Sequence, residues 1–163
     1  MEKRQVGLKL AMDAMGLSVE VGTFEDRLIL QKAVYLAQAT GVHLGYYYRW
    51  YLRGPYCPGV AADGFAVSAD LAQGLDESRR WALDGASLPK LTRIRTALED
   101  DDRSRLARSL ELLASVHFLV KQEPTLEQNP AEIVCRLQKF NKDFTQAEVE
   151  RALGEMRDNG ILS

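Results

Sequence analysis

Residues 102–121, DRSRLARSLELLASVHFLVK, carry apolar side chains along two neighbouring faces of a helix. The first stripe contains Leu106, Leu110, Leu113, His117 and Val120, and the second contains Leu112, Val116 and Leu119. A helix with apolar residues on two faces is expected to be buried on both. We therefore predict a long helix from about Asp102 to Lys121 at the centre of the molecule, with His117 as a core histidine.

Helical periodicity extends outward from this segment in both directions. It predicts further helices at about residues 5–15, 23–39, 58–71, 88–99, 129–140 and 145–158. Thr23, Ser87, Asn129 and Thr145 are the predicted N-caps, because their side-chain oxygens can accept a hydrogen bond from the first turn. Thr145 with Glu148 also has the spacing of a capping box.

One stretch has a different period. In YYYRWYLR, residues 46–53, side chains alternate in the manner of a β-strand. We expect Tyr48, Trp50 and Leu52 to face inward. The following segment GPYCPG, residues 54–59, is expected to end the strand, because its prolines cannot continue a ladder of hydrogen bonds. Pro58 can occupy the first turn of the next helix.

Composition indicates one globular domain. The chain has 163 residues, of which 46% are hydrophobic and 27% charged, and its net charge is −2. This length is enough for a core without disulfides. The charge balance argues against wholesale binding to nucleic acid or to a membrane surface. No stretch is long and apolar enough for a membrane span, and the N-terminus does not have the pattern of a signal peptide. We predict a cytoplasmic, mainly α-helical single domain over residues 1–163, with a minor β element and a C-terminal helical hairpin at 129–163 that is similar to a helix-turn-helix.

Two short motifs give a resemblance. The chain reads LQKAVYL at residues 30–36 and WYLRGPYCPG at residues 50–59. Together they resemble the SocA-type antitoxins, also described as the Panacea domain, and related uncharacterised bacterial proteins. Cys57 departs from the serine more common there, and cysteine is a weaker N-cap. The resemblance implies a small helical domain that neutralises a toxin by protein contact, in some members together with a protease.

The odd-numbered face of the predicted strand alternates aromatic and cationic residues: Tyr47, Arg49, Tyr51 and Arg53. This composition occurs in protein interfaces, on surfaces that stack nucleic-acid bases, and in ordinary arginine–aromatic packing. With the resemblance, it leads us to assign Tyr47, Arg49, Tyr51, Arg53 and Tyr56 as partner-binding residues. The expected partner is a protein, such as a toxin encoded beside it.

Gln31 and Lys32 are expected to position backbone rather than perform chemistry. One interpretation is that they support the turn containing Gly54, Pro55 and Pro58 from behind. For Lys32 we favour a second interpretation, because this residue lies beside an apolar stripe of its helix. Its aliphatic stem would run along the helix, and its amine would extend into solvent.

Catalytic and metal-binding patterns are missing from the sequence. Cys57 would need a neighbouring base to act as a nucleophile, and His43 and His117 are the only histidines. The acidic run at residues 99–102 lacks the spacing of a cation-binding loop and suits a helix N-terminus. We expect no enzyme activity, no metal and no cofactor.

The C-terminal helix pair provides the alternative function, that of a DNA-binding transcriptional regulator of the helix-turn-helix type. Its second helix would present an outer face of Gln146, Glu150, Arg151, Glu155 and Arg157. Residues 129–163 contain five basic and six acidic residues, so the excess of positive charge usual for DNA binding is missing. We therefore favour the antitoxin-like protein-binding module of a bacterial toxin–antitoxin or defence locus over DNA binding.

Overall fold

The computed structural model describes residues 1–162, which form a single, mainly α-helical domain. The seven α-helices of this part of the chain are α1 (Lys3–Ala14), α2 (Phe24–Ala39), α3 (Pro58–Ala72), α4 (Ser87–Arg95), α5 (Arg103–Gln122), α6 (Pro130–Lys139) and α7 (Gln146–Asp158). A hairpin of β1 (Arg49–Tyr51) and β2 (Gly54–Tyr56) lies between α2 and α3 in the chain. Short 3₁₀ turns span Glu77–Arg80 (η1), Thr96–Leu98 (η2) and Pro124–Gln128 (η3). The predicted fold class is confirmed.

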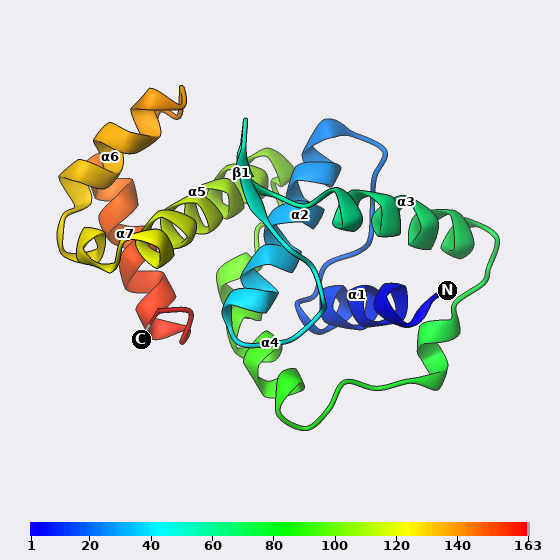
Figure 1. Cartoon of the computed structure of the whole chain (residues 1–163). Helices are drawn as coiled ribbons and strands as arrows, with labels where there is room; N and C mark the ends of the chain where they lie inside the picture. The colour runs from blue at the N-terminus through cyan, green and yellow to red at the C-terminus, as the bar shows by residue number, and fades with distance from the viewer. Residues whose placement is uncertain (163) are drawn as a thin grey trace.

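Helix α5 is the central element, as predicted. It packs along α2 on one side and against α7 on the other, and it also contacts β2, η3 and α6. Figure 1 shows α6 and α7 at one end of the molecule and α1 and α3 toward the other, with α5 running from the middle of the molecule to the end formed by α6 and α7. Side chains buried on all seven helices belong to one hydrophobic core. Helices α5 and α2 therefore form the centre of the fold, and α4 and η1 join it through α1.

Most of the predicted helix starts are confirmed by their caps. The side chains of Thr23, Asn129 and Thr145 each accept a hydrogen bond from the backbone N–H three residues on, and Asp102 does the same for α5. Ser87 is an exception, because it is already the first residue of α4. The Asp84 carboxylate caps this helix instead and accepts hydrogen bonds from the backbone N–H of Ser87 at 2.8 Å and of Ala86 at 2.9 Å.

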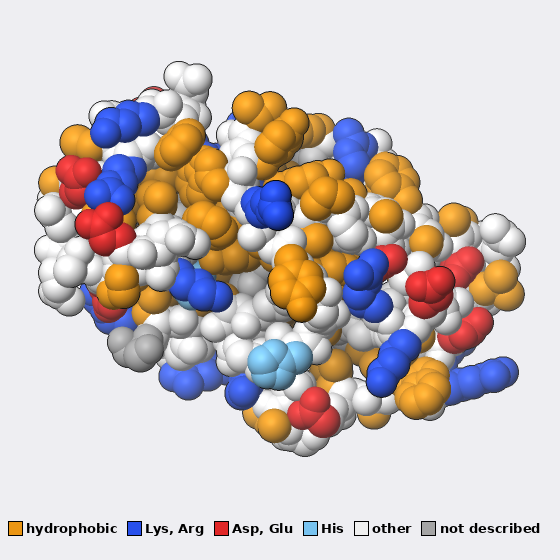
Figure 2. Space-filling view, in the orientation of Figure 1, with side chains coloured by type: hydrophobic (Ala, Val, Ile, Leu, Met, Phe, Trp, Pro, Cys, Tyr) orange, Lys and Arg blue, Asp and Glu red, His pale blue; other side chains and the backbone are white. Residues whose placement is uncertain are grey.

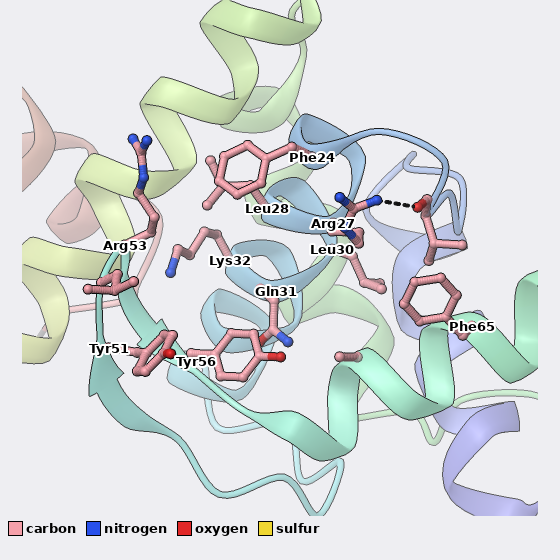
Figure 3. A pocket seen from close by; sticks show the side chains of 14 residues that line it. Phe24, Arg27, Leu28, Leu30, Gln31, Lys32, Tyr51, Arg53, Tyr56 and Phe65 are labelled. Atoms are coloured by element: carbon pink, nitrogen blue, oxygen red, sulfur yellow. Dashed lines mark hydrogen bonds between the residues drawn. The ribbon is translucent and has the colours of Figure 1, made fainter.

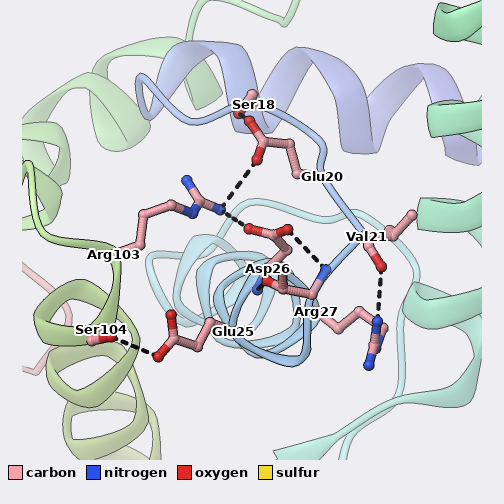
Figure 4. A network of polar contacts seen from close by, with 9 residues as sticks. Ser18, Glu20, Val21, Glu25, Asp26, Arg27, Arg103 and Ser104 are labelled. Carbon is pink, nitrogen blue, oxygen red and sulfur yellow. Dashed lines mark hydrogen bonds and ion pairs between the residues drawn. The ribbon is translucent and has the colours of Figure 1, made fainter.

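Ion pairs and hydrogen bonds connect the N-terminal ends of α2 and α5 (Figure 4). Arg103 at the start of α5 donates to Asp26 of α2 at 2.6 Å and lies 3.6 Å from Glu20. Ser104 donates to Glu25 at 2.7 Å. Burial raises the pKa of Asp26, but hydrogen bonds from Thr23 and Arg103 outweigh this effect and hold its pKa below the usual range. These contacts fix the part of α2 from which Phe24 projects.

The strand prediction is wrong in the length of the strand and in the direction of one side chain, that of Leu52. The strand covers only residues 49–51, and the GPY segment does not end the β structure but forms the antiparallel partner strand, with Trp50 opposite Pro55. Pro55 is tolerated because the sheet has only two strands and each of them is an edge. Tyr48 and Trp50 pack against the core as predicted, whereas Leu52 lies in the hairpin turn and is 75% exposed.

The C-terminal helices form the predicted pair. Helix α6 packs against α7, and α7 also packs against α5. Two of their three arginines are engaged in ion pairs: Arg136 with Glu123 and Glu132, and Arg157 with Glu127. In residues 1–162, no helix combines the length and the apolar character needed to cross a bilayer.

The central position of α5 gives a stability prediction. Leu113 is 3% exposed, and replacing it by alanine is expected to lower the free energy of unfolding by about 2–5 kcal/mol through lost burial and a residual cavity. Ser109→Ala on an exposed position of the same helix is the control, with an expected change within about 0.5 kcal/mol. Chemical denaturation measures both variants. A near-zero cost for Leu113→Ala would place this side chain outside the core.

Candidate functional site

A pocket of about 500 Å³ lies where the first half of α2, the β hairpin and the start of α3 meet. Figure 3 shows Phe24 and Leu28 of α2 on one side and Tyr51 and Tyr56 of the hairpin on the opposite side. Phe65 of α3 closes a third side. The volume is typical of ligand-binding pockets and exceeds what one side chain fills. We refer to this cavity as the hairpin pocket.

The rim of the hairpin pocket is unusually apolar for an exposed surface. Nine large hydrophobic side chains in the described part of the chain are exposed, and four of them line this pocket: Phe24, Tyr51, Leu52 and Phe65. Hydrophobic side chains gather across the upper middle of the face in Figure 2, in the region of the hairpin and its neighbouring helices. Contiguous exposed apolar surface of this kind marks interaction sites in soluble proteins.

Gln31 and Lys32 lie behind the hairpin and contact its backbone. The Gln31 side-chain amide donates to the Cys57 carbonyl at 2.8 Å and accepts from the Cys57 N–H at 3.0 Å. The Lys32 amine donates to the Pro55 carbonyl at 2.7 Å. The Tyr48 hydroxyl donates to the Gln31 carbonyl at 2.9 Å, so α2 contacts the polypeptide both before and after the turn. These bonds hold the hairpin against α2.

The expectation that the Lys32 amine extends into solvent is wrong. Lys32 is 1% exposed, because the hairpin and α5 cover the side of α2 along which its stem runs. Burial, together with the nearby charges of Lys142 and Arg53, lowers the pKa of Lys32 to about 7 against the opposing effect of Glu111. Lys32 is therefore a buried amine that is partly protonated near neutral pH and lines the hairpin pocket.

A buried charge pair lies near Lys32. Glu111 of α5 and Lys142, in the loop before α7, are 7% and 4% exposed, and the Lys142 amine donates to the Glu111 carboxylate. The Arg53 guanidinium lies 4.0 Å from the other oxygen of Glu111. Three cationic groups therefore surround a single carboxylate, and the region carries an excess of positive charge.

The lining of the hairpin pocket has the same bias. Lys32, Arg27 and Arg53 are among its lining residues, and neither aspartate nor glutamate is. Arg27 donates to the Val21 carbonyl at 2.9 Å, and the Arg53 guanidinium lies 5.5 Å from the centre of the Phe24 ring. The arrangement can bind apolar groups and can stabilise negative charge.

The predicted partner-binding residues are split between two places. Tyr51, Arg53 and Tyr56 line the hairpin pocket, and the rings of Tyr51 and Tyr56 lie 5.5 Å apart. Tyr47 is 89% exposed and lies at a separate depression that also contains His117. Arg49 is exposed and makes no ion pair with any residue of the described chain. The alternation of the sequence placed four residues on one face, but the hairpin turn brings only the last two to the pocket.

The predicted turn-supporting residues all lie at this hairpin. Gly54 lines the pocket, Pro55 accepts the hydrogen bond from Lys32, and Pro58 is the first residue of α3. Sequence reasoning missed Phe24 and Phe65, which lie on different helices, and Glu111 with Lys142. The apolar Phe24 beside the Thr23 cap is the one local signal that could have drawn attention to this rim.

The candidates for chemistry lie elsewhere. Cys57 is buried at the N-cap of α3, and its side chain makes no capping hydrogen bond. His117 contacts the Tyr35 hydroxyl through Nδ1 at 2.7 Å. Burial and the charge of Lys121 lower its pKa to about 4. Among residues 1–162, no group of three histidine, cysteine or acidic side chains is placed to hold a metal ion.

Gly54 provides a test of the close approach between the hairpin and α5. Its φ of +89° lies in the left-handed region, and a Cβ there would be 2.5 Å from the Ser115 hydroxyl oxygen. We expect Gly54→Ala to lower the free energy of unfolding by about 2–3 kcal/mol, from backbone strain and overpacking. Thermal and chemical denaturation measure the change.

Two variants separate these contributions. Gly74 has φ +74°, and a Cβ at this position would have no atom within 4 Å, so Gly74→Ala reports backbone strain alone. Ser115→Ala, which removes an unpartnered buried hydroxyl, should restore part of the stability lost by Gly54→Ala. Equal losses in Gly54→Ala and Gly74→Ala, without any restoration, would argue against close packing of the hairpin on α5.

Comparison of the chain with protein-family models, with curated proteins and with solved structures gives no match. The likeness to the SocA-type antitoxins therefore remains a resemblance of short motifs. The function has to be argued from the hairpin pocket itself.

Proposed function

We propose that this protein is a cytoplasmic, antitoxin-like protein-binding module of a bacterial toxin–antitoxin or defence locus. It acts by protein contact and not as an enzyme, and the partner docks on the hairpin pocket. The observation that carries the proposal is the concentration of exposed Phe24, Tyr51, Leu52 and Phe65 around one cavity. Aromatic anchors with arginines beside them are the usual composition of the energetically dominant part of a protein interface.

The positions of the two sequence motifs support the same site. LQKAVYL contributes Gln31 and Lys32, and the GPYCPG segment contributes the backbone groups that they hold. Both motifs also supply lining residues of the hairpin pocket. Residues that carry the resemblance therefore lie at a place where exposed apolar side chains gather. A rigid hairpin would present its aromatic rings to a partner with little loss of conformational freedom on binding.

The test is co-expression of the tagged chain with the products of neighbouring open reading frames, followed by co-purification. We expect one neighbour to be retained and to be toxic when expressed alone. Arg49→Ala/Arg53→Ala is expected to weaken retention, whereas Arg79→Ala/Arg80→Ala, at exposed positions in η1, should leave it unchanged. A neighbour that is neither toxic nor retained, together with wild-type behaviour of the Arg49/Arg53 variant, would contradict the proposal.

The alternative of DNA binding is not favoured by any contact of the C-terminal helices. Arg136 and Arg157 are engaged by glutamates of the same domain and would have to leave these partners to reach phosphates. We predict no retention of the protein on duplex DNA at about 150 mM salt, where a specific regulator would remain bound. An electrophoretic mobility assay over a range of salt concentrations tests this. Retention that falls steeply with salt and is lost in Arg151→Ala would revive the DNA-binding function.

A further inference from the structure

Positive charge exceeds negative charge around Glu111, beside the hairpin pocket. Lys32 and Lys142 are buried there, and the Arg53 side chain, which is 61% exposed, lies at the edge of the same group. Among the described residues, Glu111 is the only carboxylate that offsets the burial of Lys32. Glu111 is already engaged by Lys142. Removing charges from water is costly unless each finds an opposite charge or hydrogen-bond partners. An additional anion at this place would relieve the excess positive charge.

Lys32 also has unused hydrogen-bonding capacity. A protonated lysine has three N–H donors, and the Pro55 carbonyl is the one acceptor that its amine reaches among the described residues. Figure 3 shows this amine between Phe24 and Leu28 on one side and Tyr51 of the hairpin on the other. The side chain is part of the pocket lining, so a group that enters the hairpin pocket can meet it.

We propose that the hairpin pocket recognises a segment of the protein partner that inserts an apolar side chain together with a carboxylate, and that this carboxylate pairs with Lys32. The inference rests on the proposed function and adds the chemistry of the docking segment. The apolar walls and exposed rings would take up the hydrophobic group. The cationic lining, without an acidic residue, supplies the charge complementarity for the carboxylate.

This arrangement would also exclude the wrong segments. A neutral apolar segment would cover Lys32 and leave its charge without a partner, and a basic segment would add repulsion from Arg27 and Arg53. Both would bind more weakly than an acidic one although they fit the same volume. Selection would therefore come from the charge at the base of the pocket, whereas the rim contributes contact area.

The test uses two small probes that differ in charge, 4-phenylbutanoate and 4-phenylbutanamide. Their binding to the full chain is followed at pH 6 by NMR chemical-shift changes. We expect the acid to bind about tenfold more tightly than the amide, since a charge-assisted contact to a buried amine favours the carboxylate. The shifts should concentrate at residues 24–32 and 49–65. Equal affinity of acid and amide, binding elsewhere, or no binding of the acid would overturn the proposal.

Lys32→Met provides the matched variant, because methionine fills a similar volume without the charge. It should abolish the preference for the acid, whereas Lys3→Met, at an exposed position of α1, should retain it. In the wild type, affinity for the acid should fall about tenfold between pH 6 and pH 8 as Lys32, with a pKa of about 7, loses its proton. The charged groups that surround Lys32 here are Glu111, Lys142, Arg53 and Arg27. A pH-independent affinity would contradict the pairing even if Lys32→Met failed to fold.

Other occupants give different results. If native mass spectrometry of the freshly purified chain shows a bound small organic acid, the pocket belongs to a metabolite and the proposal is overturned. If the chain is a dimer that 4-phenylbutanoate dissociates, the pocket is occupied by a second copy and the proposal is likewise overturned. If the neighbour-encoded partner binds Lys32→Met as tightly as wild type, the inference fails but the proposed function stands. If no partner is retained by the wild type, the proposed function itself fails.

Discussion

Replacing Glu111 by leucine is expected to lower the free energy of unfolding by about 3–5 kcal/mol, although leucine fits a helix and an apolar environment. Glu111 is 7% exposed and binds the amine of Lys142, which is 4% exposed. Without its carboxylate, Lys142 and Lys32 remain buried among cations only. Breaking one partner of a buried pair leaves the other charge uncompensated, and this penalty exceeds the gain from added apolar surface. Urea denaturation at pH 7 measures the loss.

The double variant Glu111→Leu/Lys142→Met removes both charges of this pair. We expect it to regain much of the lost stability, because a buried ion pair replaced by apolar groups of similar volume is often neutral. Glu155→Leu, at an exposed position of α7, is the control and should change stability by no more than about 0.5 kcal/mol. A small cost for Glu111→Leu, or no recovery in the double variant, would show that the pair is not buried as described.

The second large effect concerns the rim of the hairpin pocket. Tyr51→Ser/Phe65→Ser is expected to weaken binding of the protein partner about 1,000-fold, because two aromatic anchors each contribute about 2 kcal/mol at the centre of an interface. Tyr51 and Phe65 are 60% and 51% exposed, so stability should change little. Titration calorimetry with the co-purified partner measures the affinity, and circular dichroism checks the fold.

The control removes the same kind of surface elsewhere. Leu75 and Trp81 are 54% and 66% exposed and do not line the hairpin pocket. Leu75→Ser/Trp81→Ser should bind the partner with an affinity close to that of wild type. If both double variants lose affinity equally, the loss reflects general surface hydrophobicity. If only the Leu75/Trp81 variant loses it, docking occurs on the face around η1 and the hairpin pocket is not the interface.

Local features of the fold are predictable from the sequence. The central helix, its two apolar stripes and most of the N-caps depend on residues within a turn or two of one another. Thr23, Asn129 and Thr145 cap their helices because a side-chain oxygen at that position satisfies a backbone N–H in any context. The prediction of Ser87 as a cap is wrong, since Ser87 is itself the first residue of α4 and the Asp84 carboxylate accepts hydrogen bonds from the N–H groups of Ala86 and Ser87.

The hairpin is predictable only in part. Alternation correctly places Tyr48 and Trp50 toward the core, but it continues the strand through Leu52, where the chain turns. The prolines predict an end to the β structure, although a two-stranded hairpin leaves Pro55 at an edge. Gly54, with φ +89°, is the local sign of the turn, because few other residues adopt that backbone conformation.

The site depends on contacts between distant segments, and these leave no local pattern. Glu111 lies on α5, Lys142 precedes α7, and Arg53 belongs to the hairpin, so no spacing connects them. The same holds for Phe24 and Phe65, which meet at one rim from two helices. The expectation that the Lys32 amine extends into solvent is wrong because the hairpin, a different segment of the chain, covers it. Nothing in the sequence of the helix that carries Lys32 predicts this cover. The burial of Lys32, Glu111 and Lys142, and the convergence of Phe24 and Phe65 on one pocket, are properties of the assembled fold.

The central claim is that a protein partner docks on the hairpin pocket. Hydrogen–deuterium exchange of the chain, alone and saturated with its co-purified partner, tests this most directly because it maps the protected backbone without any substitution. We predict slower exchange in the complex at residues 24–32, 49–56 and 59–66, which contribute the walls of the pocket. Residues 130–158 of α6 and α7 should exchange as in the free chain. Protection confined to α6 and α7, with an unchanged hairpin, would contradict the account.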